Sequence, residues 1–271
     1  MNSPSLDLQT KKTNLFLVLA GIFIASAIVA ELVGVKIFSA EKALGISPAQ
    51  IHLFGDFILD FNLTAGVILW PIVFLTSDII NEYFGKAGVK KISYLTAALI
   101  SVAFIAIYLI TILPPADFWL DVNGIDPSGK PFNIDYAFKA IFQQGLGIIL
   151  GSLIAFLIGQ LLDVFIFQKL RKWTGSKMIW LRATGSTLVS QLIDSYVVLF
   201  IAFYLLSPPN TQWPLAQIMA VGTINYIYKF FVAIILTPLL YVGHHIIDKY
   251  LGKENAERLT TEAAASSKSL I

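Results

Sequence analysis

Residues 92–115 read ISYLTAALISVAFIAIYLITILPP, a mostly apolar run that has no charged side chain and ends on two prolines. An α-helix needs about 20 predominantly apolar residues to cross the hydrocarbon core of a bilayer. Residues 92–113 meet that length, and Pro114 and Pro115 predict where the helix stops. This stretch therefore places the chain among membrane proteins.

The composition of the whole chain agrees with this assignment. Of 271 residues, 56% are hydrophobic and only 13% are charged, whereas soluble globular proteins carry about 25% charged residues. This excludes an ordinary soluble enzyme and makes the lipid bilayer the expected surroundings. The lack of cysteine excludes disulfides, thiolate metal sites and cysteine nucleophiles. A net charge of only +2 gives no support for a nucleic-acid partner.

Five further windows are similar to residues 92–113 in length and apolar character. The first is longer than the apolar core of a signal peptide, and Glu31 and Lys36 stand where a cleavage site would lie. The predicted fold is an all-α polytopic membrane protein, one domain over residues 1–250, followed by a polar tail at 251–271 that is expected to fray. Its six transmembrane helices are predicted at 15–38, 65–84, 92–113, 146–170, 185–206 and 215–242.

Lysine and arginine are distributed unevenly among the segments that connect these spans. Most lie before the first span, between spans two and three, between spans four and five, and after span six. Because positive charge accumulates on the cytoplasmic side, we predict that both termini are cytoplasmic and that the chain lies in the inner membrane of the cell. On the outer side, residues 39–64 predict a short hairpin or a re-entrant cap around Gly55-Asp56, and residues 114–145 predict an ordinary solvated loop.

Ionisable residues interrupt the apolar spans. An ionised side chain at the centre of a membrane helix costs about 2.5–3.5 kcal/mol, so each one raises a functional hypothesis. One of them is a cation, Lys229, and Glu82 lies near a helix end. The others are carboxylates inside the spans: Glu31, Asp78, Asp163 and Asp194.

The spacing of small residues predicts where Asp163 points. In span four, small residues recur every four positions and Asp163 is the next member of the series, which consists of Gly147, Gly151, Ala155 and Gly159. Small residues at this spacing let another helix approach closely. We therefore expect Asp163, and Gln160 one turn before it, to face a neighbouring helix and not lipid.

Span five repeats this pattern. Ser186, Ser190 and Asp194 are four residues apart, and Gln191 precedes Asp194 by three, as Gln160 precedes Asp163. Residues at these spacings share one face of a helix. The two Gln-x-x-Asp words therefore predict polar faces on consecutive helices that run in opposite directions.

Spans two and six carry the remaining polar groups. Asp78, Asn81 and Glu82 follow the i, i+3, i+4 spacing and lie on one helix face. Pro71, one to two turns earlier, is expected to kink this helix and free a backbone carbonyl. Near the middle of span six, the polar group consists of Asn225, Tyr226 and Lys229.

Two interpretations of these residues remain open. They either pair with one another and hold the bundle together, with Lys229 as the counter-ion, or they line a binding site. The excess of carboxylates favours a site, since buried acids can carry protons or bind a cationic group. Carboxylates, amides and aromatic rings together suit a flat heterocycle with several N–H donors. The rings available for stacking are Tyr226, Tyr228, Phe165 and Trp180.

Four parts of the chain resemble, in order, the queuosine precursor transporter family. They are Leu75–Lys86 (LTSDIINEYFGK), Gly159–Arg171 (GQLLDVFIFQKLR), Ser190–Asp194 (SQLID) with Phe200–Tyr204 (FIAFY), and Tyr226–Phe230 (YIYKF) with Pro238–Tyr241 (PLLY). The resemblance implies an importer of the 7-deazaguanine bases preQ0 and preQ1 for queuosine salvage in tRNA. It also suggests a six-helix arrangement like the substrate-binding subunits of energy-coupling-factor vitamin transporters, by analogy of fold alone.

On this hypothesis a small-molecule base binds at a central site, and we expect no cofactor and no metal. The two Gln-x-x-Asp words and the groups on spans two and six supply most of the site. The predicted substrate-binding residues are Glu31, Asp78, Asn81, Glu82, Gln160, Asp163, Gln191, Asp194, Asn225, Tyr226 and Lys229.

Other functions stay open at this point. Two alternatives are another small heterocycle as the substrate, and a role as the substrate-binding subunit of an ATP-driven transporter. The chain lacks the G-x-x-x-x-G-K-[ST] loop and would then need a separate ATPase. An intramembrane aspartyl protease is not expected, because no Gly-x-Gly-Asp word precedes either aspartate of spans four and five. A homodimer is neither favoured nor excluded.

Overall fold

The computed structural model describes residues 4–53, 57–143, 146–175 and 178–266. Within these ranges, five helices are long and apolar enough to cross a bilayer. Their outer faces carry exposed apolar side chains such as Leu17, Val102 and Ile235, which only lipid can cover favourably. The long helices are α1 (Pro4–Val33), α3 (Trp70–Thr111), α6 (Leu146–Thr174), α7 (Ile179–Phe200) and α8 (Leu215–Leu251). This confirms the predicted all-α polytopic membrane fold.

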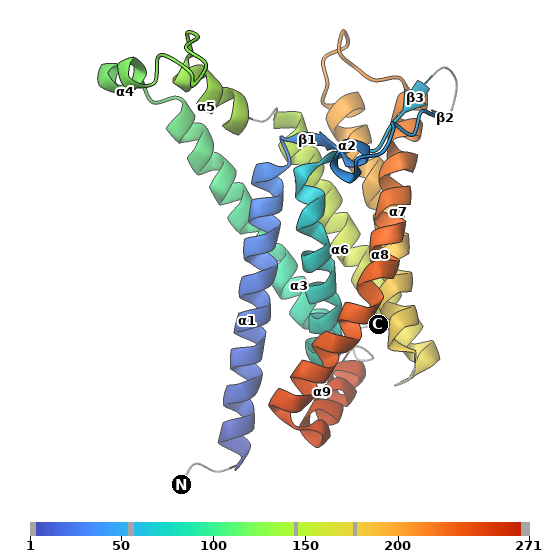
Figure 1. The fold of residues 1–271 in the computed structure, drawn as a ribbon. Coiled ribbons are helices and arrows are strands. Elements are labelled where there is room, and N and C mark those ends of the chain that lie inside the picture. Colours follow the sequence, from blue (N-terminus) through green and yellow to red (C-terminus); the bar gives the residue numbers. More distant parts are fainter. Residues whose placement is uncertain (1–3, 54–56, 144–145, 176–177, 267–271) are drawn as a thin grey trace.

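Helix α3 is broken at Gly85. Its 42 residues would extend about 63 Å as one straight helix, twice the thickness of a bilayer core. Gly85 has φ 67° and ψ −171°, a conformation that glycine adopts at little cost. The chain runs along the first arm to Gly85 and turns back along the second, so the two arms are antiparallel (Figure 1). They contain the second and third predicted spans, and the count of six spans stays a prediction.

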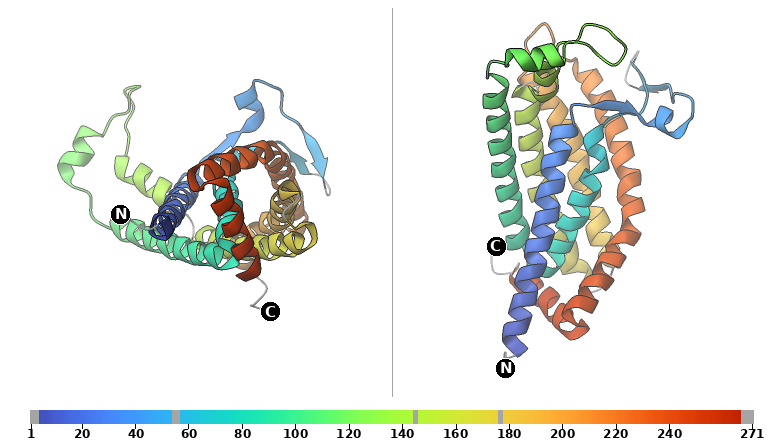
Figure 2. Two further views of the ribbon diagram at one scale, coloured as in Figure 1. Left: turned by 90° about the horizontal axis from the view of Figure 1, so that it is seen from below. Right: turned by 60° about the vertical axis from the view of Figure 1, so that its left-hand side comes forward.

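The long helices define two ends of the bundle. We call the end with the start of α1 and with α9 (Lys253–Ser266) the terminal end. Helix α9 lies across this end (Figure 2). Its side chains Ala256, Leu259 and Ala263 are buried, and the main-chain oxygen of Thr260 accepts a hydrogen bond from Arg171 of α6. This part of the tail, expected to fray, is instead a packed helix.

The opposite end carries a small β structure, residues 37–64, which we call the cap (Figures 1 and 2). Strand β1 (Ile37–Ser39) pairs antiparallel with β4 (Asn62–Thr64), and β2 (Ile51–Leu53) pairs antiparallel with β3 (Phe57–Leu59). The predicted hairpin is thereby confirmed, although its Gly55-Asp56 turn falls outside the described residues. Helix α2 (Ala40–Leu44) lies between β1 and β2.

The cap also ties α1 to the first arm of α3. Ile37 pairs with Thr64, directly before the 3₁₀-helix η1 (Ala65–Ile68) that leads into α3. In η1, a Cβ added to Gly66 would lie only 2.6 Å from the carbonyl oxygen of Ala30. The backbones of α1 and η1 therefore approach as closely as glycine allows.

Helices α6 and α7 pack along the predicted stripe of small residues. A Cβ added to Gly151 would lie 3.2 Å from the carbonyl oxygen of Val198 and from the amide nitrogen of Ala202. Gly159 faces the Cβ of Asp194, and Asp163 is 6% exposed. The expectation that Asp163 faces a neighbouring helix is confirmed.

Residues 114–145 contain more structure than the predicted loop. Two short helices, α4 (Asp117–Val122) and α5 (Ile134–Phe142), lie between α3 and α6 at the cap end. Asn133 caps α5 by accepting the N–H of Tyr136, as this residue type often does. Between the helices, the Asp126 carboxylate accepts the N–H groups of Ser128 and Lys130.

Glu41 of α2 holds the cap together. Its carboxylate is 3% exposed and accepts the N–H of Phe61 at 2.6 Å and the hydroxyl of Ser39 at 3.0 Å. Burial acts to raise the pKa of Glu41, but the hydrogen bonds from Phe61 and Ser39 outweigh it and hold the pKa below its ordinary value of 4.5. The ionised carboxylate is therefore the form that stabilises the cap.

We expect the contribution of Glu41 to be present above its unfolded-state pKa and lost as the pH falls through its lower folded-state pKa. At pH 7, Glu41→Ala should accelerate hydrogen exchange of the Phe61 amide about tenfold, because this N–H loses its buried acceptor. The ratio of variant to wild-type exchange should shrink in acid. Glu254→Ala, at an exposed position of α9, is the control. Equal exchange of Phe61 in variant and wild type at pH 7 would contradict the assignment.

Candidate functional site

A cavity of about 330 Å³ lies inside the bundle beneath the cap. It is bounded by α1, the first arm of α3, α6, α7 and α8, and by Ile37, Leu63 and Thr64 of the cap strands. Its size falls at the lower end of the range for small-molecule sites, which is about 300–1,000 Å³. We call it the central cavity.

The central cavity brings together six of the predicted site residues. They come from four helices and would lie far apart in an unfolded chain. They are Glu31 of α1, Gln160 of α6, Gln191 and Asp194 of α7, and Asn225 and Lys229 of α8. Of the two Gln-x-x-Asp words, Gln160, Gln191 and Asp194 line this cavity, whereas Asp163 does not.

Two of the charges in this cavity neutralise each other. The ammonium of Lys229 donates to the carboxylate of Asp194 at 2.5 Å, and these side chains are 19% and 20% exposed. Lys229 therefore pairs with a carboxylate, as the first of the two open interpretations expects, and the same pair also lines the cavity. Glu31, at 8% exposed, accepts a hydrogen bond from the Ser152 hydroxyl at 2.5 Å and keeps its carboxylate on the cavity wall.

The two glutamines differ in how they are satisfied. The Gln160 side-chain oxygen accepts a hydrogen bond from the Ser77 hydroxyl at 2.9 Å. The Gln191 side-chain oxygen is buried and has no hydrogen-bond partner among the described residues. Because a buried polar atom without a partner costs free energy, Gln191 is the residue on this wall that most needs a ligand.

Aromatic rings form part of the apolar wall, together with aliphatic side chains such as Val67 and Leu199. Trp70 stacks on Phe74 with ring centroids 6.0 Å apart and approaches Phe156 at 5.8 Å. Tyr228 was named, whereas Trp70 and Phe74 carry no signal beyond their position beside Pro71. Of the other named rings, Tyr226 packs against Phe230, and the exposed Phe165 and Trp180 point away.

Phe203 reaches the cavity from a π-helical turn, Ile201–Leu205, at the end of α7. Its ring stacks on Trp213 with centroids 4.2 Å apart, and its carbonyl oxygen accepts the N–H of Trp213. Such turns insert an extra residue into a helix and occur often at functional sites. The hydrophobic periodicity of the sequence does not predict this turn.

The remaining predicted residues lie deeper, toward the terminal end. Asp163 accepts hydrogen bonds from Thr187 and Ser190, both at 3.4 Å, and Ser190 also lines the central cavity. Asn81 accepts a hydrogen bond from Gln168 at 2.6 Å. Asp78 lines a separate small cavity. The structure therefore divides the predicted group: one part surrounds the cavity and the other lies below it.

Glu82 is the centre of a buried ion cluster at the terminal end. Arg182 donates to both carboxylate oxygens of Glu82, at 2.7 and 3.1 Å, and Arg171 lies 3.4 Å from one of them. All three side chains are at most 7% exposed. Arg171 also binds α9, as described above, so the cluster links α3, α6, α7 and α9. A second cavity, of about 1060 Å³, adjoins it.

The structure assigns the Glu82 cluster a bracing role, and this can be tested by stability. Glu82→Gln leaves two buried guanidinium groups without their carboxylate, and loss of one partner of a buried ion pair costs about 3–5 kcal/mol. We expect a clear drop in the thermal unfolding temperature of the purified protein. Glu262→Gln breaks the exposed pair with Arg258 and should have little effect. Equal unfolding temperatures for the two variants would refute the bracing role.

Comparison with known proteins identifies similar chains. Residues 64–243 match a protein family described as "Putative vitamin uptake transporter". Two curated relatives are named "Probable queuosine precursor transporter". That of Bacillus subtilis is 28% identical over 191 residues, 69% of this chain and 75% of the relative. That of Haemophilus influenzae is 28% identical over 176 residues, 65% and 66% of the two chains.

A third relative, the "Queuosine precursor transporter" of Escherichia coli, is 28% identical over 188 residues, 68% of this chain and 73% of the relative. No solved structure is significantly similar to the chain. The predicted likeness to energy-coupling-factor subunits therefore stays a prediction. The matched residues 64–243 include the arms of α3 and most of the central cavity.

Proposed function

Because the chain belongs to this family of uptake transporters and is a transport protein rather than an enzyme, we propose that it carries queuosine precursors, the 7-deazaguanine bases preQ0 and preQ1, across the membrane. The observation that carries the proposal is the central cavity. It combines carboxylate, amide and aromatic side chains at a depth where an apolar bundle otherwise excludes them. Its volume of about 330 Å³ suits a single base.

The chemistry of the base matches these groups. A 7-deazaguanine presents a ring N–H and an exocyclic amino group beside a carbonyl. The Glu31 carboxylate offers acceptors for both donors, and the amides of Gln191 and Asn225 supply a donor for the carbonyl. The rings of Trp70 and Tyr228 provide flat apolar surface for the heterocycle.

The Asp194–Lys229 pair suits the substituent of the base. PreQ1 carries an ammonium group, and Asp194 is a carboxylate on the cavity wall. In the absence of substrate, Lys229 satisfies this carboxylate. A substrate ammonium that binds Asp194 has to share or displace this contact with Lys229, and Glu31 is the other carboxylate on the cavity wall. Asp194 is the residue we assign to preQ1.

We propose import, with both termini in the cytoplasm and the cap on the outer side of the inner membrane. Lys86, Lys90 and Lys91 follow the Gly85 break at the terminal end, which is the side that the distribution of positive charge makes cytoplasmic. In this orientation the cap lies over the central cavity on the outer side. The Glu82 cluster closes the cytoplasmic side.

Uptake by cells that cannot make the base tests the proposal. We expect expression of the chain to restore queuosine in tRNA when preQ0 or preQ1 is supplied. Glu31→Gln and Gln191→Ala should each lower uptake at least about tenfold, the effect of losing a hydrogen bond to a charged or buried group. Gln217→Ala, on α8 outside the cavity lining, is the matched control.

The host should lack energy-coupling-factor subunits, so that uptake there also excludes a need for a separate ATPase. Binding of preQ0, preQ1 and guanine to the purified protein completes the test. No binding of either precursor would overturn the proposed function. Binding that Glu31→Gln and Gln191→Ala leave intact would overturn only the placement of the site.

A further inference from the structure

Asp78 is a buried carboxylate that the central cavity does not use. It lies on the first arm of α3 and is 7% exposed. Its oxygen Oδ1 is buried and has no hydrogen-bond partner within the described ranges. The carboxylate has a side-chain hydrogen bond from Thr187, but an ionised Oδ1 would lack one to offset its burial. A positively charged ligand would therefore stabilise the ionised side chain.

A small cavity beside Asp78 provides room for one. Its volume is about 20 Å³, enough for one water-sized guest. The polar residues on its wall are Asp78 and three threonines, and the rest are mainly apolar. The hydroxyls of Thr184 and Thr237 bond to each other at 2.8 Å, and that of Thr187 bonds to Asp163.

Two further carboxylates lie near Asp78 and make its surroundings more acidic. Asp163 of α6 and Glu82 of α3 are the carboxylates that act on it electrostatically. The charge of Glu82 is compensated by Arg182 and Arg171, whereas Asp163 accepts hydrogen bonds from the hydroxyls of Thr187 and Ser190. Two neighbouring carboxylates in an apolar bundle are more stable when one of them is protonated than when both are ionised.

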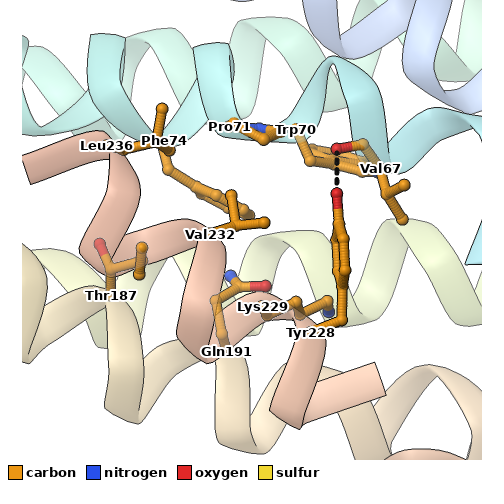
Figure 3. A pocket seen from close by; sticks show the side chains of 11 residues that line it. Val67, Trp70, Pro71, Phe74, Thr187, Gln191, Tyr228, Lys229, Val232 and Leu236 are labelled. Carbon is orange, nitrogen blue, oxygen red and sulfur yellow. Dashed lines mark hydrogen bonds between the residues drawn. The ribbon is translucent and has the colours of Figure 1, made fainter. Parts of the chain in front are cut away.

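A further small cavity, which we call the passage, shares lining residues with the cavity at Asp78 and with the central cavity. It is a cavity of about 30 Å³, and Figure 3 shows Trp70 and Phe74 on one wall and Thr187 and Gln191 on another. Gln191, Tyr228 and Lys229 line both the passage and the central cavity. Phe74 and Thr187 line both the passage and the cavity at Asp78. The site that suits a base and the unpartnered acid are thus adjacent compartments.

We propose that Asp78 binds the proton whose movement drives uptake of the base. This deepens the proposed function and rests on it. The proton comes from water on the cap side, forms an O–H bond with Asp78, and returns to water on the terminal side when the carboxylate ionises again. The terminal-end cavity includes Glu82, one turn of helix from Asp78, and offers the exit.

A proton fits this place better than a metal cation. A sodium ion needs several oxygen ligands in a shell around it, as other hard cations do. The threonine hydroxyls on this wall already bond to each other or to Asp163. Protonation of a carboxylate needs only the one free oxygen that Asp78 presents.

The test uses the full chain in liposomes with preQ0, which has no ammonium of its own. We expect wild type to accumulate preQ0 at least about tenfold when the outer side is acidic, and to acidify the lumen as it does so. Asp78→Asn should still bind preQ0 within about threefold of wild type and exchange it down its gradient. It should not accumulate preQ0 in response to the pH gradient. Asp78→Glu, which restores a carboxylate, should recover accumulation, and Asp117→Asn, at an exposed position of α4, should behave as wild type.

The outcomes separate the two proposals. Binding and exchange without any response to the pH gradient would overturn the proton site and leave the proposed function standing. The same holds if a sodium gradient drives accumulation instead, or if Asp78→Asn accumulates preQ0 like wild type. A wild-type chain that neither binds nor exchanges a precursor would overturn the proposed function itself. Loss of both binding and thermal stability in Asp78→Asn, with full activity in Asp78→Glu, would make Asp78 a brace and also overturn the proton site.

Discussion

Inside a bilayer, a polar side chain must find a protein partner or a wet space, because lipid offers neither hydrogen bonds nor counter-charge. The buried Glu82–Arg182–Arg171 cluster meets this constraint by pairing, and it joins four helices at one end. Polar space is present at both ends of the bundle: the central cavity lies beneath the cap, and the larger cavity adjoins this cluster. Both lie where polar side chains of the helices gather.

The same constraint sorts the acids of the bundle by role. Glu82 is fully paired and braces the helices, while Asp194 is paired with Lys229 at a cavity wall, where a ligand can exchange the partner. Glu31 is buried on the same wall with one serine donor. Asp78 has an oxygen without any partner in the described structure. The charge of Glu82 is neutralised within the chain, whereas Asp194 and Asp78 depend more on a bound ligand or proton.

Much of this could be predicted from the sequence because hydrophobic length and helical spacing are local properties. The spans and the face of Asp163 follow from residues within a few turns of one another, whereas the pair of Lys229 with Asp194 joins two helices and residues 35 positions apart. Spacing assigns a residue to a face, but it does not assign its depth along the neighbouring helix. For this reason Asp78, Asn81 and Glu82 share one helix face but have different surroundings. Asp78 lines the small cavity, Asn81 bonds to Gln168, and Glu82 lines the cavity at the terminal end. The fold of α9 onto Arg171 and the π-helical position of Phe203 depend on tertiary contacts that no local pattern records.

The ladder between β1 and β4 has a mechanical consequence. It joins the top of α1 to the start of α3 by paired strands, and the close contact of Gly66 with Ala30 removes the remaining freedom between them. Helices α6 and α7 are clasped just as closely along their glycines. The protein thus contains two closely packed helix pairs, α1 with the first arm of α3 and α6 with α7, and the central cavity is lined by both. On the proposed function, we expect the movement that carries the base across to be a rocking of one pair against the other.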